Sequence, residues 1–154
     1  MNFQPISRAN RKLFYEMMVR YFRENEQEET PIDDLEMYIG QLYGMLTCGS
    51  IQGRIAYTPE AVGFVLWKVG AADSVSAQLP GYGCILEIDV NPEARNKGAG
   101  CAMAAFAEAE TLAAGAQGVY VCAEGPVQDF WRKRGYAESD RMTCGGQKIF
   151  IRQY

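Results

Sequence analysis

The sequence predicts an α/β fold in which a mixed central sheet of six to seven strands is flanked by about four helices. Two observations predict it. Segments whose apolar residues alternate with period two recur along the chain, and segments with apolar residues every three or four positions lie between them. With 154 residues, 48% of them hydrophobic, the chain fits one ordinary domain with a single core, which we place at residues 1–154.

The N-terminal part of the chain is predicted to hold two amphipathic helices after a short extended segment. Ser7 stands where an N-cap is needed, ahead of a helical apolar stripe at 13–22 that we assign to the core. Thr30 is a second candidate cap, with Pro31 at the first helical position. The apolar residues of 32–46 recur at helical spacing, so a second helix follows.

The remainder of the chain alternates between strands and helices. A hairpin is expected over 51–69, where β-rich segments flank the turn at Pro59 and Glu60. An Ala-rich helix from about 98 to 114 ends at Gly115. The other expected elements are strands at 83–90, 118–123, 136–140 and 146–152, and a short helix at about 126–134.

The composition excludes several kinds of chemistry and partner. Histidine is absent, which excludes Ser-His-Asp and Cys-His catalysis and the commonest zinc ligand sets, so we expect no metal. The net charge of −4 argues against nucleic acid and mildly favours a cationic small partner. The apolar runs are strand-sized and the N-terminus is polar, so we expect neither export nor a membrane partner. Five widely spaced cysteines without a C-x-x-C pair are typical of reduced thiols in a cytoplasm.

The segment 86–100, LEIDVNPEARNKGAG, is the most informative part of the chain. A strand runs into a loop with Arg95, Gly98 and Gly100 at R-x-x-G-x-G spacing, and a helix starts at once. Glycines let the backbone approach a ligand, and a helix N-terminus offers unpaired N–H groups to an anion such as a pyrophosphate. The spacing is neither a Rossmann fingerprint nor a Walker A motif. Lys97 and Arg95 add positive charge beside the loop.

Two blocks of the sequence resemble the GNAT superfamily of acyl-CoA-dependent N-acyltransferases. Residues 95–100, RNKGAG, are similar to the family's R/Q-x-x-G-x-G/A signature. Residues 130–136, FWRKRGY, are similar to its second block, an aromatic pair followed by K-x-G-F/Y. The order of elements also agrees, so the resemblance covers essentially the whole chain and implies a GNAT-like fold that binds acetyl-CoA.

The resemblance also implies which residues hold the cofactor. Backbone groups near Ile88 and Val90 are expected to pair with the pantetheine arm. The expected pyrophosphate ligands are the N–H groups of the loop and first helical turn, with the side chains beside them: Arg95, Asn96, Lys97, Gly98, Ala99, Gly100 and Cys101. Trp131 stands where the family often has a tyrosine that protonates the CoA thiolate, so we expect it to wall the thiol end of the cofactor instead. The general acid is left unassigned, with Tyr136 as a nearby alternative that suits a core ring better.

Glu87 and Asp89 are the candidate catalytic residues. They alternate with apolar residues, so both carboxylates leave the same face of an interior strand, where a charge is costly unless it is paired or functional. The functional interpretation is a general base for the attacking amine, Glu87 first and Asp89 second. The alternative is an ion pair or a solvated position.

We therefore predict transfer of an acetyl group from acetyl-CoA to a primary amine by direct attack, without a covalent enzyme intermediate. The alternatives are a longer acyl donor and a non-catalytic acyl-CoA sensor or interaction module. The acceptor is expected to be a small molecule or peptide. An acidic stretch either attracts a cationic acceptor electrostatically or is simply a solvated loop. Its residues are Glu24, Glu26, Glu28, Glu29, Asp33, Asp34 and Glu36. Sheet-edge homodimers are common in such folds, so a homodimer is also to be tested.

Overall fold

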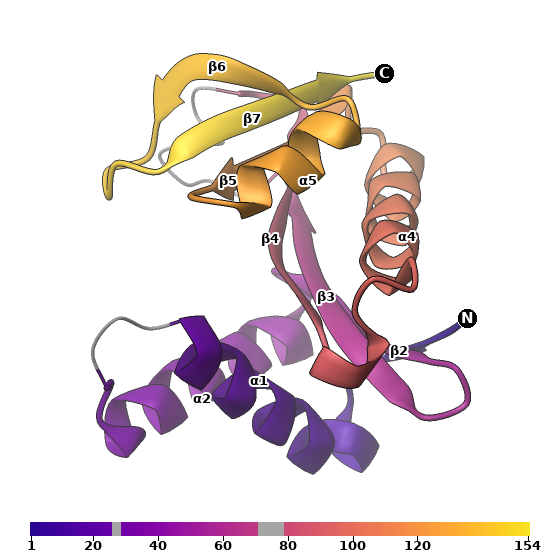
Figure 1. Ribbon diagram of the computed structural model, residues 1–154, viewed down its shortest axis with the longest axis vertical. Coiled ribbons are helices and arrows are strands. Elements are labelled where there is room, and N and C mark those ends of the chain that lie inside the picture. The colour runs from indigo at the N-terminus through magenta and orange to yellow at the C-terminus, as the bar shows by residue number, and fades with distance from the viewer. Residues whose placement is uncertain (26–28, 71–78) are drawn as a thin grey trace. The chain divides into compact units, whose positions relative to one another are not determined.

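The computed structural model describes residues 1–25, 29–70 and 79–154, and in them seven strands form one sheet. The strands are β1 (Asn2–Pro5), β2 (Gln52–Tyr57), β3 (Ala61–Val69), β4 (Tyr82–Val90), β5 (Gly118–Ala123), β6 (Ala137–Met142) and β7 (Lys148–Gln153). They are hydrogen-bonded in the order β1-β2-β3-β4-β5-β7-β6 (Figure 1). The β4–β5 pair is parallel, whereas β1–β2, β5–β7 and β6–β7 are antiparallel. The predicted mixed sheet is therefore confirmed.

Four α-helices occur in the described part of the chain, as the sequence predicts. They are α1 (Arg11–Asn25), α2 (Ile32–Cys48), α4 (Ala99–Ala113) and α5 (Val127–Lys133). Two 3₁₀ helices add to them, η1 (Arg8–Asn10) and η2 (Pro92–Ala94). None of the helices described is long and apolar enough to cross a membrane.

The chain divides into two compact units. The first comprises Met1–Leu66 and Glu87–Ala104, and the second comprises Trp67–Leu86 and Ala105–Tyr154. Every residue of the predicted pyrophosphate loop and both candidate catalytic carboxylates belong to the first unit. Trp131 belongs to the second.

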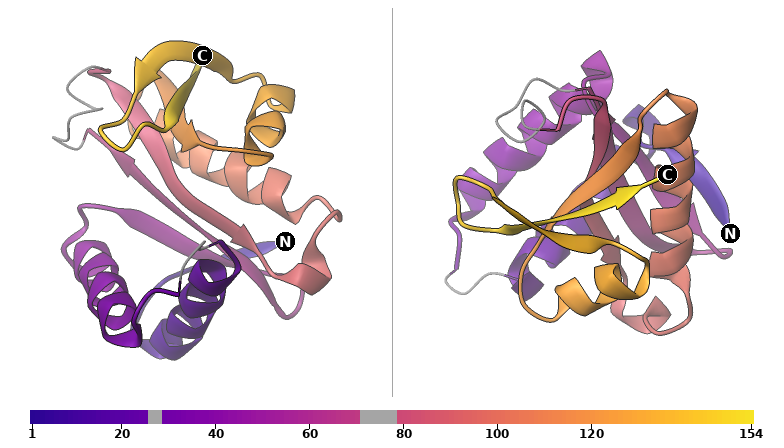
Figure 2. Two further views of the ribbon diagram at one scale, coloured as in Figure 1. Left: turned by 60° about the vertical axis from the view of Figure 1, so that its left-hand side comes forward. Right: turned by 90° about the horizontal axis from the view of Figure 1, so that it is seen from above.

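In the first unit, β3 carries helices on both of its faces. The ring of Phe64 makes edge contacts with Phe14 and Tyr21 of α1, with centroids 5.7 and 6.0 Å apart. The neighbouring residue Gly63 faces the other way: a Cβ placed there would lie 2.1 Å from the backbone oxygen of Asp89 in β4 and 2.8 Å from Cε of Met103 in α4. Gly63 therefore allows the backbone of β4, and beside it the side chain of Met103, to approach β3 closely. Figures 1 and 2 show α1 and α2 side by side in this unit.

The N-cap predicted at Ser7 is present, whereas the one predicted at Thr30 is not. Ser7 and Asn10 form a reciprocal capping box at η1, which leads directly into α1. Gly49 ends α2 with φ of 79°, the left-handed conformation that glycine favours. The prediction that Thr30 caps α2 is wrong, because Pro31 is the N-cap and no side chain supplies a capping hydrogen bond.

The second unit is built around β5, which is buried along most of its length. Residues Tyr82–Ile85 of β4 pair with it on one side and β7 on the other (Figure 2). The side chains of Leu79, Cys84, Tyr120 and Ile149 form a common core cluster. Helix α5, which carries Trp131, contacts the sheet through Arg132, whose guanidinium lies 5.2 Å from the ring centroid of Phe150 in β7.

Candidate functional site

The backbone of the loop between β4 and α4 takes two left-handed conformations. Asn96 has φ of 60° and Gly98 has φ of 85°, and α4 begins at Ala99. A Cβ added at Gly98 would meet no atom within 4 Å, so the space beside this residue is open. Because the first N–H groups of a helix have no partner within the helix, the start of α4 presents donors next to an open surface. The geometry suits an anion such as the pyrophosphate predicted from the sequence.

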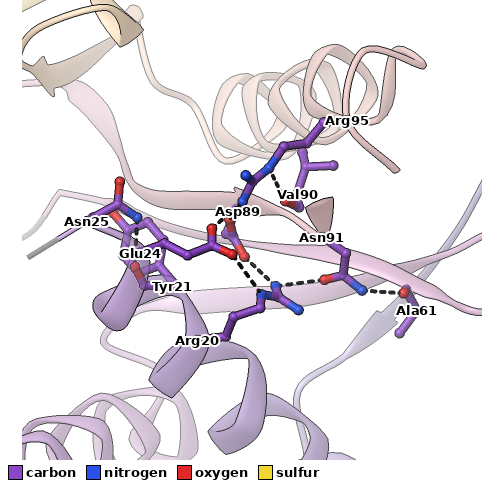
Figure 3. Close-up of polar contacts among 9 residues, drawn as sticks. All are labelled: Arg20, Tyr21, Glu24, Asn25, Ala61, Asp89, Val90, Asn91 and Arg95. Atoms are coloured by element: carbon purple, nitrogen blue, oxygen red, sulfur yellow. Dashed lines mark hydrogen bonds and ion pairs between the residues drawn. The ribbon is translucent and has the colours of Figure 1, made fainter. Parts of the chain in front are cut away.

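Asp89 is buried and ion-paired to α1. Nη2 of Arg20 donates to Oδ2 of Asp89 at 2.6 Å and to Oδ1 of Asn91 at 2.8 Å (Figure 3). The amide of Asn91 donates in turn to the backbone oxygen of Ala61, at 2.7 Å. Asp89 is 6% exposed, and its carboxylate is committed to this network. These contacts argue against Asp89 as the general base and favour the ion pair that was its alternative interpretation.

The side chain of Arg95 turns back toward β4 and α1. Its Nε donates to the backbone oxygen of Val90 at 2.9 Å, and Nη2 donates to Oε2 of Glu24. The same Nη2 lies 3.7 Å from Oδ1 of Asp89 (Figure 3). The charge of Arg95 is therefore already matched by carboxylates. The predicted contact of Arg95 with the cofactor therefore depends on its backbone, or on a change of side-chain conformation that releases the guanidinium from these carboxylates.

Glu87 has a different environment, although it leaves the same face of β4. Oε2 of Glu87 accepts a hydrogen bond of 2.5 Å from the hydroxyl of Tyr21 in α1. Burial raises the pKa of Glu87 above its ordinary value, and the hydrogen bond from Tyr21 offsets part of that rise. No cation pairs with Glu87 among the residues that the structure describes. A half-buried carboxylate without a cation is suited to accept a proton from an ammonium group.

Two residues at this site were missed by the sequence analysis. Tyr21 was assigned to the apolar stripe of its helix, but its hydroxyl contacts Glu87 and its ring contacts Phe64. Arg20 carried no signal of its own, since a charged residue on an amphipathic helix usually faces solvent. The adjacency of Arg20 and Tyr21 is the one signal in the sequence, because two neighbouring polar groups on a helix can contact two alternate carboxylates of a strand. Which carboxylates they contact depends on how α1 packs on β4.

The remaining residues of the loop lie between η2 and the first turn of α4. Lys97 donates through Nζ to the backbone oxygen of Glu93 at 2.8 Å, which holds its ammonium beside η2. Cys101 is exposed in the first turn of α4, and Ala99 is buried. The backbone N–H of Ala102 donates to the oxygen of Gly98 at 3.0 Å, which closes that first turn.

Within the second unit, Trp131 is a buried ring and Tyr136 is its neighbour. Trp131 is 3% exposed and makes edge contacts with Phe130 and Tyr136, at centroid distances of 4.9 and 5.0 Å. The hydroxyl of Tyr136 donates to Oε1 of Glu108 at 3.0 Å, and burial and the Glu108 carboxylate raise its pKa. These contacts support Tyr136 as a core ring rather than a general acid. The cofactor contact of Trp131 stays a prediction.

The acidic stretch that runs from the end of α1 into α2 is partly accounted for by internal contacts. Glu24 pairs with Arg95, and Glu36 accepts a hydrogen bond from Tyr15 at 3.1 Å. Asp33 and Asp34 lie in the first turn of α2, where the helix dipole favours negative charge. Glu26 and Glu28 lie outside the described residues. The attraction of a cationic acceptor by this stretch stays a prediction.

Comparison with known proteins agrees with the fold. The model of the acetyltransferase (GNAT) family matches residues 11–136, which include the loop, both carboxylates and Trp131. The chain belongs to this family, which confirms the resemblance seen in the sequence. Acetyltransferase activity is the class of function that the fold and the loop support together.

Solved structures with the same fold are distant in sequence. An acetyltransferase from Thermus thermophilus is 15% identical, with a TM-score of 0.72 over 99% of this chain and 96% of that one. The ribosomal-protein-alanine N-acetyltransferase from Brucella melitensis is 14% identical, with a TM-score of 0.74 over 100% of both chains. The PaiA N-acetyltransferase from Thermoplasma acidophilum, solved in complex with coenzyme A, is 16% identical, with a TM-score of 0.68 over 100% of both. No curated protein matches the sequence significantly. At these identities the likeness shows the fold alone.

Proposed function

We propose that this protein transfers an acetyl group from acetyl-CoA to a primary amine, with Glu87 as the general base. The observation that carries the proposal is the half-buried Glu87 carboxylate, whose Oε1 makes no hydrogen bond among the described residues. Acetyl-CoA supplies the activated thioester. Glu87 accepts the proton that an ammonium group must lose before its nitrogen can act as a nucleophile.

The cofactor side of the proposal rests on the loop of residues 95–101. Two left-handed residues, Asn96 and Gly98, bring the chain into α4 with the donors of its first turn unpaired within the helix. We expect the pyrophosphate to accept from these N–H groups. Backbone binding of this kind depends on the glycine at 98 far more than on a particular charged side chain.

The acceptor side rests on the charge balance between α1 and β4. Among the described residues, the carboxylates of Glu24 and Asp89 pair with two guanidinium groups, those of Arg20 and Arg95, and no ion pair reaches Glu87. The unmatched negative charge therefore lies on Glu87. A cationic amine balances it, whereas an anionic acceptor would be repelled.

The decisive experiment measures CoA thiol release with a panel of primary amines and, separately, the Kd of acetyl-CoA. Replacement of Glu87 by Gln should lower kcat by about 10²-fold or more and leave the acetyl-CoA Kd unchanged. Glu110→Gln is the matched control, because it makes the same chemical change at an exposed position of α4 and should retain full activity. Full activity of Glu87→Gln would reject Glu87 as the base.

The same assay separates the alternative functions. A chain that binds acetyl-CoA tightly but releases no thiol with any amine would be a non-catalytic acyl-CoA module. A clear preference for a longer acyl-CoA over acetyl-CoA, measured as kcat/KM, would reassign the donor. Binding itself is visible in a melting curve, because a ligand at about 100 times its Kd stabilises a protein by roughly 2.7 kcal/mol.

A further inference from the structure

We propose that Tyr21 is a positioning residue for Glu87, one whose hydroxyl holds Oε2 of the carboxylate so that Oε1 is left for the acceptor amine. The inference rests on the proposed function in which Glu87 is the general base. It assigns a role in the reaction to a helix residue that lies 66 positions away in the sequence.

The geometry of the contact supports a fixed orientation. The hydroxyl of Tyr21 donates to Oε2 of Glu87 at 2.5 Å, which is in the range of a charge-assisted O–H···O⁻ bond. The ring itself is held on two sides, by Phe64 of β3 at 6.0 Å and an interplanar angle of 87°, and by Phe22 at 5.5 Å and 68°. A ring held in this way loses little further entropy when it makes the hydrogen bond.

The backbone around Tyr21 is anchored to the same strand by its neighbour. Arg20 binds Asp89 at 2.6 Å, so two adjacent residues of α1 hold two alternate residues of β4. The Arg20 contact is one of those that fix the register of the helix against the strand. Tyr21 then meets Glu87 and no other carboxylate in the described part of the chain.

The contact with Tyr21 affects the pKa of Glu87 as well as the orientation of its carboxylate. Among the described residues, Glu87 interacts with the Tyr21 hydroxyl from α1 and the Tyr38 hydroxyl from α2, and the Asp89 carboxylate of its own strand interacts with the same Tyr21 hydroxyl. Burial, and after it the negative charge of Glu87, raises the pKa of Tyr21 far above its ordinary value, so its hydroxyl keeps its proton and donates at neutral pH. Its hydrogen bond favours the ionised carboxylate and lowers the pKa of Glu87 against the effect of burial. Without Tyr21, Glu87 should hold its proton to a higher pH.

The first test is the pH dependence of kcat/KM in Tyr21→Phe. A base is active when ionised, so the acid limb of the profile should move to higher pH by about one unit, the shift expected for one hydrogen bond to a charged group. At the old midpoint the variant should lose roughly 10-fold, and most of the activity should return at higher pH. Tyr38→Phe is the matched control: it removes a nearby hydroxyl that makes no hydrogen bond to Glu87 among the described residues, and its profile should match the wild type.

The second test needs no turnover. The pKa of the Glu87 carboxyl is followed by ¹³C NMR in the wild type, in Tyr21→Phe and in protein with 3-fluorotyrosine at position 21. The Phe variant should raise the Glu87 pKa. Fluorotyrosine, which keeps the ring and is a stronger donor, should lower it, and this arm covers the case in which Tyr21→Phe fails to fold. An unchanged Glu87 pKa in the folded variants would overturn the inference. A shifted pKa together with a fully active Glu87→Gln would instead reject Glu87 as the base and leave the Tyr21 contact standing.

Discussion

Arg20 and Asp89, 69 positions apart in the sequence, form an ion pair in which Nη2 donates to Oδ2 at 2.6 Å. The carboxylate is 6% exposed and the arginine side chain 31%. Replacement of Asp89 by Asn should lower the free energy of unfolding by about 1–3 kcal/mol, because it removes the buried negative charge that faces the guanidinium groups of Arg20 and Arg95. Urea denaturation measures this loss.

Asp129→Asn is the control for that measurement. Asp129 pairs with Arg132 at 3.0 Å, but its side chain is 74% exposed, so the loss should stay below about 0.5 kcal/mol. Equal effects at the two positions would mean that burial does not strengthen the Arg20–Asp89 contact.

Gly98 is expected to matter for cofactor binding rather than only for folding. Gly98→Val forces a branched residue to φ of 85°, which should cost about 1–2 kcal/mol of stability, and it places a side chain where the pyrophosphate is expected. The Kd of acetyl-CoA, measured by calorimetry, should rise roughly 10-fold or more.

Gly115→Val is the control that separates the effect of backbone strain on stability from the effect on acetyl-CoA binding. Gly115 has φ of 93°, open space beside it and a position after the C-terminus of α4, so its stability loss should be similar. Its acetyl-CoA Kd should not change. A near-normal Kd in Gly98→Val would remove the main premise of the cofactor site.

Trp131 should contribute strongly to stability through its buried ring. Trp131→Ala should lower the free energy of unfolding by roughly 3–5 kcal/mol, and Trp131→Phe should keep most of the stability and most of the activity. Phe130→Ala, at the adjacent half-buried aromatic residue, should cost clearly less. A Phe variant at 131 that folds and binds CoA but is inactive would show that the indole N–H has a chemical role.

Glu87 is expected to make the folded protein less stable at neutral pH than it could be. Its pKa is raised in the folded state, so the folded protein binds the proton more tightly than the unfolded chain does. The ionised carboxylate therefore destabilises the fold above the folded-state pKa, and the penalty disappears below the unfolded value of about 4.3. Glu87→Gln should raise the urea midpoint at pH 7 and leave it unchanged near pH 3. A lower midpoint at pH 7 would contradict this.

Much of the fold follows from local patterns that a single sequence carries. The strand at 118–123 was predicted with the observed bounds, and the Ala-rich helix differs from the observed α4 by one residue at each end. Periodicity and stop signals act over a few residues, so they can be read without knowing the rest of the chain. The start of α2 was less accurate, because Thr30 and Pro31 are each acceptable caps and only the backbone angles distinguish them.

Local patterns are enough to establish that Glu87 and Asp89 leave the same face of one strand, because period-two alternation spans only a few residues. The glycine-containing loop after them is also a local pattern, given by the spacing of Arg95, Gly98 and Gly100. How the two carboxylates differ depends on long-range packing. Asp89 meets Arg20, and Glu87 meets Tyr21, at separations of 69 and 66 residues. Such contacts require a particular register of α1 against β4. That register is set by the side chains of the whole interface, and no local pattern encodes it.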